Sequence, residues 1–209
     1  ANIWACLRKP SREFDQYKNQ LERENSIDIN PIYFDLENAK QIKKGFEKIK
    51  SSKKNIDILV NNAGAIFTAL FQMTPLEKIN QMLQINYVSQ MVFTQYVSRQ
   101  MMKQRFGNII NVSSSAAVYA NQGRMAYASS KAALITATKV LAKELGPYNI
   151  RANVVSPGLT DTEMMKNSTS ENALNETINS LCLRRIGDPD EIAKSILFLS
   201  SDLSSYVTG

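Results

Sequence analysis

Hydrophobic residues along the chain fall into short aliphatic runs, separated by longer segments in which they recur every three or four positions. The short runs have the length and composition of β-strands. They occupy residues 2–7, 29–34, 56–60, 109–112 and 150–155. The run at 56–60 is almost continuously aliphatic, which predicts a strand that is covered on both faces.

The longer segments predict amphipathic helices. In residues 37–50, for example, Ile42, Phe46 and Ile49 form one apolar stripe. Two segments begin with a capping box that has proline at the first helical position, at residues 74–77 and 188–191. Helices are expected at residues 11–24, 37–50, 76–105 with room for a bend, 125–145 and 189–200. Residues 159–183 predict a mobile helical flap with an apolar underside.

Alternating strands and helices predict an α/β fold, a doubly wound parallel sheet with helices on both faces, as in Rossmann-like proteins. No internal repeat or long linker divides the chain, so residues 1–209 are interpreted as a single domain. In such sheets ligands bind beyond the carboxyl ends of the strands.

Composition narrows the class of protein. With 44% hydrophobic and 21% charged residues, the 209-residue chain is typical of a soluble globular domain. The formal net charge of +6 comes from scattered residues, which argues against nucleic acid and fits a smaller anionic partner, such as a phosphorylated cofactor or an acidic carrier. Two distant cysteines indicate neither a disulfide framework nor a zinc site, and no apolar run is long enough to span a membrane. We expect a cytoplasmic protein.

The chain contains no histidine. This removes Ser-His-Asp and Cys-His mechanisms and the commonest metal sites, so no metal is expected. A general acid must therefore be Tyr, Lys, Asp, Glu or Cys.

The strongest candidate for such chemistry follows the strand at 109–112. Ser114 lies at the end of this strand, and Tyr127 and Lys131 lie one turn apart on the next helix. An ammonium beside a phenol lowers the phenol pKa and favours proton exchange near neutral pH. The alternative is a half-buried tyrosine on an amphipathic helix, with a lysine reaching for solvent.

Unusual residues also follow the other predicted strands. They are Arg8, Asp35, the Asn61-Asn62-Ala63-Gly64 segment and Pro157-Gly158. Each has a simple structural explanation as a turn, a strand end or a solvated cation. Together they mark one edge of the sheet as a binding site.

The ordered set of Asn61 to Gly64, Asn86, Ser114, Tyr127-x-x-x-Lys131 and Pro157-Gly158 resembles the short-chain dehydrogenase/reductase family along nearly the whole chain. Within that family the motifs are most similar to those of 3-oxoacyl-[acyl-carrier-protein] reductases. Further segments carry this likeness: residues 56–64, 101–109, 126–128 and 153–158.

The resemblance implies a catalytic role for four residues. Tyr127 would exchange a proton with the substrate oxygen, and Ser114 would donate a hydrogen bond to the same oxygen. Lys131 would lower the Tyr127 pKa and hold the nicotinamide ribose. Asn86 would hold a water that links Lys131 to solvent.

The resemblance also implies a set of cofactor-binding residues at the strand ends. They are Arg8, Asp35, Leu36, Asn61, Ala63, Gly64, Tyr127, Lys131, Pro157, Gly158, Thr160 and Thr162. Arg8-Lys9, with no acid before Glu13, favours the 2′-phosphate of NADP(H) over NAD.

The chain departs from the family at both ends. None of its eight glycines forms the Gly-rich turn that follows the family's first strand, and the family's last edge strand is not found after Gly209. The first βα unit and the last strand are therefore expected to be absent from this sequence, which leaves the sheet incomplete at both ends.

The function implied is NADPH-dependent reduction of a 3-oxoacyl thioester on acyl carrier protein, with Arg105 and Lys143 docking the acidic carrier. Alternatively, both cations are solvated helix ends. Other substrates, such as a sugar, a polyol or a small ketone, stay open, as does a non-catalytic relative. We expect a homodimer or homotetramer formed through helices near 76–105 and 126–145.

Overall fold

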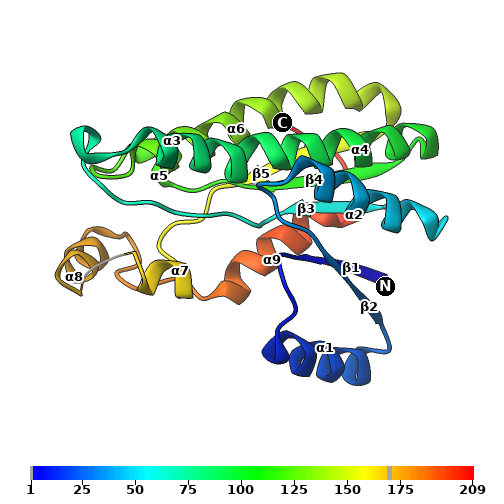
Figure 1. Ribbon diagram of the computed structural model, residues 1–209, viewed down its shortest axis with the longest axis horizontal. Coiled ribbons are helices and arrows are strands. Elements are labelled where there is room, and N and C mark those ends of the chain that lie inside the picture. Colours follow the sequence, from blue (N-terminus) through cyan, green and yellow to red (C-terminus); the bar gives the residue numbers. More distant parts are fainter. Residues whose placement is uncertain (1, 169–170) are drawn as a thin grey trace.

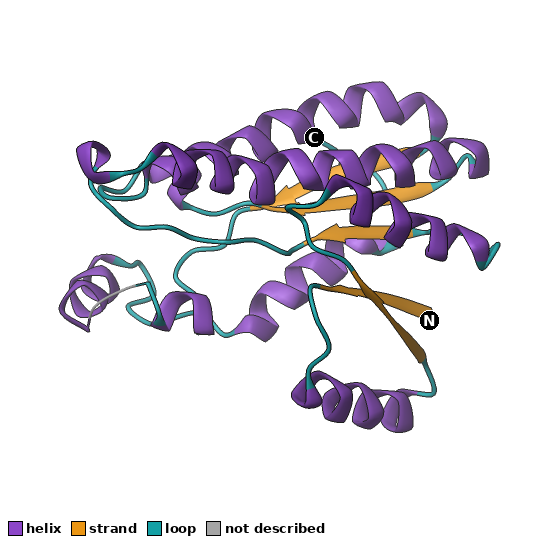
Figure 2. Cartoon of the chain, viewed as in Figure 1, coloured by secondary structure: helices purple, strands orange, loops and turns teal. Residues whose placement is uncertain are grey.

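The computed structural model describes residues 2–168 and 171–209, and it confirms the α/β class with parallel strands. The strands form two groups that share no ladder, as Figure 2 shows. One sheet has three strands in the order β3-β4-β5, and the other has the order β1-β2.

The three-stranded sheet contains β3 (Ile58–Asn61), β4 (Gly107–Val112) and β5 (Ile150–Val155). Four helices lie on one side of it in Figure 1: α2 (Ala39–Ser51), α3 (Leu76–Leu83), α4 (Ser89–Gln104) and α6 (Met125–Leu145). Helix α9 (Pro189–Ser200) lies on the other side and contacts β4 and β5. All six residues of β4 are buried, because this strand is paired on both edges.

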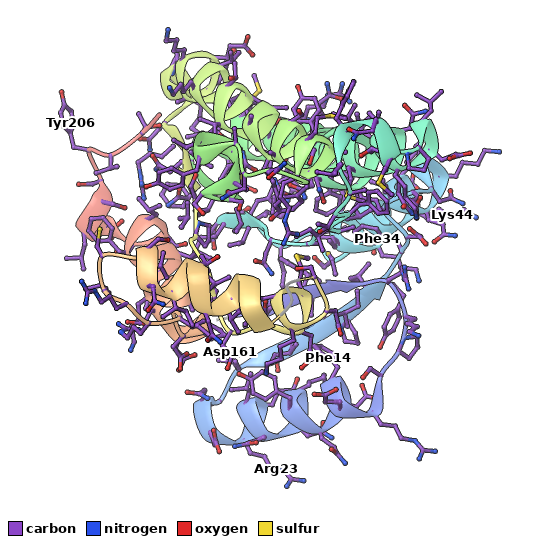
Figure 3. All side chains as sticks on the ribbon, turned by 90° about the vertical axis from the view of Figure 1, so that its left-hand side faces the viewer. Phe14, Arg23, Phe34, Lys44, Asp161 and Tyr206 are labelled. Carbon is purple, nitrogen blue, oxygen red and sulfur yellow. The ribbon has the colours of Figure 1, made fainter. Side chains whose placement is uncertain are left out.

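The two-stranded unit consists of β1 (Asn2–Leu7), α1 (Arg12–Asn25) and β2 (Asp28–Tyr33). Helix α1 begins at Ser11, whose hydroxyl accepts a hydrogen bond from the Phe14 amide, and it has no buried residue. Phe14 lies on the side of α1 that faces the strands, and Arg23 points away from them (Figure 3).

The predicted helix at 76–105 is divided by a π-helical turn, η2 (Gln84–Val88), at the place where a bend was expected. The flap at 159–183 contains two short helices, α7 (Glu163–Lys166) and α8 (Glu171–Ser180). The remaining short elements are η1 (Phe71–Met73), α5 (Ala116–Tyr119), η3 (Gly146–Tyr148) and η4 (Asp202–Ser204).

One prediction about the sheet is wrong. The run at 56–60 was expected to be covered on both faces, but Ile58 and Val60 are exposed, whereas Ile56 and Leu59 are buried in the core. The reason is that Ile58 and Val60 point to the face on which α9 packs against β4 and β5, and β3 lies beside this cover at the edge of the sheet.

At the other edge of this sheet, the end of the chain returns to β5. The Gly209 amide donates to the Ala152 carbonyl at 2.9 Å, while Tyr206 projects away from the fold (Figure 3). Within the described residues, no helix is long and apolar enough to cross a membrane.

Candidate functional site

Strand β4 places two serines at its carboxyl end. The Ser113 hydroxyl donates to the Lys131 carbonyl at 2.7 Å, and the Ser113 amide donates to Val155 at 2.8 Å, so the strand end is fixed to both α6 and β5. Ser114 is half-buried and lies next in the chain, where it is free to face the rim of the sheet. Its hydroxyl accepts from the Ala116 amide at 3.2 Å.

Helix α6 brings Tyr127 and Lys131 to the same place. Both side chains are buried, with 8% and 4% of their surfaces exposed. The Ser114 hydroxyl is near enough to the Tyr127 phenol to lower its pKa. The structure therefore brings Ser114 and Tyr127 together at the rim of the sheet, with Lys131 one turn further along the helix.

The Lys131 ammonium is held by a backbone carbonyl at the end of β4. It donates to the Val112 carbonyl at 2.8 Å, and this is its one acceptor among the described residues. Gly64 lies against it: a Cβ atom at this position would be 3.4 Å from Lys131 Nζ and 3.1 Å from Asn86 Oδ1. A larger residue at position 64 would therefore crowd both functional groups.

Asn86 lies in the π-helical turn and is completely buried. Its side-chain Oδ1 accepts a hydrogen bond from the Ala65 backbone amide at 2.8 Å, and its Nδ2 donates one to the Ala65 carbonyl at 2.9 Å. It also donates to the Ser130 hydroxyl at 2.9 Å, and Ser130 in turn donates to the Tyr127 carbonyl at 2.7 Å. Asn86 thus joins the β3–α3 loop to the catalytic helix.

The electrostatics of Tyr127 differ from the sequence prediction. Burial raises the pKa of the phenol, while the Ser114 hydrogen bond and the charge of Arg124 oppose this effect. Lys131 is not among the groups that lower it, because its ammonium is turned toward the Val112 carbonyl. Burial lowers the pKa of Lys131 itself to about 8. That Lys131 lowers the Tyr127 pKa therefore stays a prediction, and sequence reasoning missed Arg124.

Asn61, predicted to bind cofactor, directs its side chain into the core. Its amide donates to Thr94 Oγ1 and to Asn111 Oδ1, both at 2.8 Å. Only the backbone of Asn61 and the following residues, Ala63 and Gly64, can face a ligand at this strand end. The Ala63 carbonyl is fixed by the Gln90 amide at 2.6 Å.

Arg8 and Asp35 lie at neighbouring strand ends, because the Phe34 amide donates to the Leu7 carbonyl at 2.9 Å. Arg8 is exposed, and Asp35 accepts a hydrogen bond from the Glu37 amide at 2.8 Å. Leu36 is connected to the helical layer through its carbonyl, which accepts from the Ser89 hydroxyl.

The loop after β5 returns to the serines of β4. The Pro157 carbonyl accepts from the Ser115 amide at 2.8 Å, and nothing lies within 4 Å of a Cβ atom built on Gly158. Thr160 forms a bridge with Gly187, and Thr162 caps α7. This open backbone and the two remaining N–H groups of Lys131 fit the nicotinamide end of a dinucleotide.

Arg105 and Lys143 lie away from these groups. Arg105 ends α4, with its guanidinium 5.4 Å from the centre of the Tyr148 ring, and Lys143 lies in the last turn of α6. Along α6, Lys143 is roughly 24 Å from Tyr127 at 1.5 Å per residue. The predicted docking cations are therefore separate from the catalytic groups of the same chain.

Comparison with known proteins gives consistent matches. A family model described as enoyl-(acyl carrier protein) reductase matches residues 2–209. The 3-oxoacyl-[acyl-carrier-protein] reductase of Thermotoga maritima is 41% identical over 181 residues, which are 87% of this chain and 73% of that protein. An acetoacetyl-CoA reductase of an Acinetobacter species is 33% identical over 95% of this chain and 80% of its own length. The crystal structure of an NAD⁺-bound xylitol dehydrogenase superposes with a TM-score of 0.88 at 28% identity, covering 99% of this chain and 85% of that one.

Proposed function

The chain belongs to the short-chain dehydrogenase/reductase family, and from this premise we propose that it reduces the carbonyl of a 3-oxoacyl thioester on acyl carrier protein. The observation that carries the proposal is the convergence of Ser114 and Tyr127 at the rim of the sheet, with the buried Lys131 one turn further along α6. Two relatives support the substrate class, because their names specify 3-oxoacyl-carrier and acetoacetyl thioesters.

In this proposal the Tyr127 hydroxyl gives its proton to the carbonyl oxygen as the alcohol forms. The Ser114 hydroxyl donates a hydrogen bond to the same oxygen and so holds it beside the phenol. Lys131 stabilises the phenolate that is left, and a water chain past Asn86 returns the proton from solvent. Bound NADPH would supply the hydride.

The proposed cofactor is NADP(H). Arg8 is exposed at the end of β1 and offers a cation for a 2′-phosphate, with Asp35 and Leu36 beside the adenine. Ala63 and Gly64 would line the adenosine side, and Lys131 would hold the nicotinamide ribose. The segment Pro157, Gly158, Thr160 and Thr162 would line the nicotinamide and pyrophosphate.

The test is NADPH oxidation by the full-length protein with an acetoacetyl thioester. Tyr127→Phe is expected to lower kcat by about a hundredfold or more, since it removes the proton donor. Tyr119→Phe, on the exposed surface of α5, is the matched control and should leave kcat unchanged. Full activity in Tyr127→Phe would refute the assigned role. A folded wild-type protein with no turnover of any carbonyl compound would favour a non-catalytic relative.

Carrier docking is proposed for Arg105 and Lys143, which are both exposed. Reversing both charges to Glu should raise KM for a carrier-linked thioester several-fold, because the acidic carrier loses two cations. The same variant should leave KM for the coenzyme A thioester unchanged. An equal change for both substrates would contradict docking.

We also propose a homo-oligomer formed through α4 and α6. Their outer faces enclose a groove of about 480 Å³ lined by Tyr87, Met91, Ala137, Val140 and Leu141. A second copy packing its own α4 and α6 there would cover this apolar surface. Ala137→Glu should then shift the protein to monomer in sedimentation analysis, and an unchanged oligomer would contradict the proposed interface.

A further inference from the structure

Arg124 lies at the start of the catalytic helix and has no part in the mechanism above. It precedes Met125, the first residue of α6, and its carbonyl accepts from the Ala128 amide at 2.7 Å. Since Arg124 and Tyr127 are three residues apart at the first turn, their side chains lie on the same side of the helix. The Arg124 side chain is half-buried there rather than extended into solvent.

The guanidinium also reaches the flap. Its Nη2 atom donates to the Ser168 carbonyl at 3.1 Å. Ser168 ends the α7 segment, since its amide donates to the Met165 carbonyl at 3.1 Å. A single side chain therefore contacts the end of α7 and stands beside the phenol that exchanges the proton.

The interaction between the two residues is electrostatic and mutual. The positive charge of Arg124 lowers the pKa of Tyr127, and the phenolate in turn favours the charged form of Arg124. Burial lowers the Arg124 pKa, but a guanidinium keeps its charge in proteins. This charge opposes the effect of burial, which raises the Tyr127 pKa.

Among the described residues, no other charged group shifts the Tyr127 pKa. The elements α5 and η2, which pack against α6, bring no charged residue, and the phenols they bring are those of Tyr119 and Tyr87. Helix α3 brings Glu77, which is exposed, and Lys78, which donates to Gln81 at 3.1 Å. On α7, Lys166 pairs with Asp161 at 3.0 Å and with Glu163 at 4.0 Å. On α6 itself, Lys131 is bound to the Val112 carbonyl.

We propose that Arg124 is a positioning residue, which anchors the flap at Ser168 to the start of α6 and places its own positive charge on the Tyr127 side of that helix end. The inference rests on the proposed function. When the phenol O–H bond breaks and the proton moves to the substrate oxygen, the negative charge left on Tyr127 is stabilised by this guanidinium. Anchoring the flap and supplying the proton thus depend on the same side chain.

Two variants separate the two roles. Arg124→Met keeps the length of the side chain and removes the charge, whereas Arg124→Lys keeps the charge and removes the planar fork that binds the Ser168 carbonyl. In the alcohol-oxidation direction, where Tyr127 must be deprotonated, Arg124→Met should shift the acidic limb of the kcat/KM profile upward by about 0.5–1 pH unit and lower kcat/KM about three- to tenfold at neutral pH. Arg124→Lys should keep the wild-type pH profile and raise KM several-fold.

Arg99→Met, which removes an exposed arginine from α4, is the matched control and should change neither quantity. If Arg124→Met and Arg124→Lys lower activity equally without moving the pH profile, Arg124 is only an anchor of the helix start, and the proposal is overturned.

A second readout does not depend on turnover. The ultraviolet difference spectrum between each protein and its Tyr127→Phe counterpart reports the ionisation of Tyr127 alone. Arg124→Met should shift this titration to higher pH, and Arg124→Lys should not. If the wild type turns over no carbonyl, the proposed function fails, and this titration still decides the placement of the charge: an unshifted curve overturns it.

Discussion

The three-stranded sheet and the two-stranded sheet are built from the same strand and helix units, but they are buried to different degrees. All six residues of β4 are buried, whereas none of β1 is. The contrast extends to the helices: α6 buries eight residues, and α1 buries none. Tyr127 and Lys131 therefore lie on a close-packed layer, whereas the unit proposed for the adenosine end of the cofactor joins the core through fewer side chains, among them Trp4, Ile32 and Phe34.

Buried side-chain amides connect the three-stranded sheet to its helices more extensively than the two-stranded sheet is connected to α1. In the large sheet, Asn61 bonds to Thr94 and Asn111, and Asn111 donates to Thr138 at 2.8 Å, which ties β3, β4, α4 and α6 together. In the small unit, a side-chain hydrogen bond between α1 and β2 comes from Glu22, which accepts from the Ile29 amide at 2.8 Å. The contrast teaches that packing on several sides fixes the geometry of Tyr127 and Lys131, and that α1, with no buried residue, is attached more weakly.

The largest effect on stability is expected in the centre of β4. Ile109 is fully buried, so Ile109→Ala should lower the free energy of unfolding by about 3–4 kcal/mol through lost burial and a cavity. Ile3→Ala, at a side chain 41% exposed on β1, should cost less than about 1 kcal/mol. Urea unfolding of both variants measures the two values. Equal losses would show that the two sheets are packed to the same degree.

A smaller effect is expected from the buried amides. Asn111→Ala removes a donor to Thr138 and an acceptor for Asn61, which leaves buried polar groups unpaired and should cost about 2–3 kcal/mol. Asn30→Ala on exposed β2 is the matched control and should change the free energy of unfolding by less than about 0.5 kcal/mol. A cost for Asn111→Ala below that of the control would contradict the structural role of this chain of amides.

Burial of the Lys131 ammonium is expected to lower the stability of the folded protein. Its pKa is lowered to about 8 by burial, so below pH 8 the folded protein bears the full penalty of a buried ammonium. As pH rises from 8 toward the ordinary value of 10.5, the unfolded state binds more protons and stability increases. Lys131→Met should therefore raise the free energy of unfolding at pH 7 by about 1–2 kcal/mol. This is less than the roughly 3.5 kcal/mol that the pKa shift corresponds to at about 1.4 kcal/mol per unit, because the hydrogen bond to the Val112 carbonyl is lost as well.

The advantage of Lys131→Met should shrink between pH 8 and 10.5. Urea unfolding at pH 7 and at pH 10, with Lys139→Met on the exposed side of α6 as control, measures it. If the free energy of unfolding of Lys131→Met equals that of the wild type at pH 7, or if their difference does not change with pH, the buried ammonium does not destabilise the fold.

Sequence patterns were sufficient for the parts of the molecule that motifs and periodicity specify. The order of strands and helices, the bend near Asn86 and the meeting of Ser114 with Tyr127 all follow from residue types at fixed spacings. The family motifs added the cofactor-binding positions, and the structure places Arg8 and Asp35 at adjacent strand ends.

The remaining features depend on three-dimensional neighbours that no local pattern encodes. Exposure of Ile58 and Val60 depends on where α9 packs on the sheet, and the direction of the Lys131 ammonium depends on the nearby Val112 carbonyl. Arg124 lies outside every motif, and its only sequence signal is its position three residues before Tyr127. Burial and charge at the site therefore had to come from the structure.

The smallest effect is expected where α1 meets β2. Glu22 accepts from the Ile29 amide and pairs with Lys18 at 2.9 Å, and both contacts lower the pKa of its carboxyl group. This contribution is present at neutral pH and is lost as pH falls through the lowered pKa, because the protonated form is a weaker acceptor. Glu22→Ala should leave the midpoint of global unfolding almost unchanged, since α1 buries no residue.

The same variant should, however, speed hydrogen exchange at the Ile29 amide. At acidic pH the exchange rate of the wild type, corrected for the intrinsic rate, should approach that of the variant. Glu24→Ala removes the same charge from the same helix without a contact to β2, because Glu24 accepts only from Gln20 among the described residues. Slower exchange at Ile29 in Glu22→Ala, or equal exchange in both variants, would mean that the backbone ladder of β1 and β2 alone holds this unit. The Glu22 side chain would then add nothing to the local stability of β1, α1 and β2.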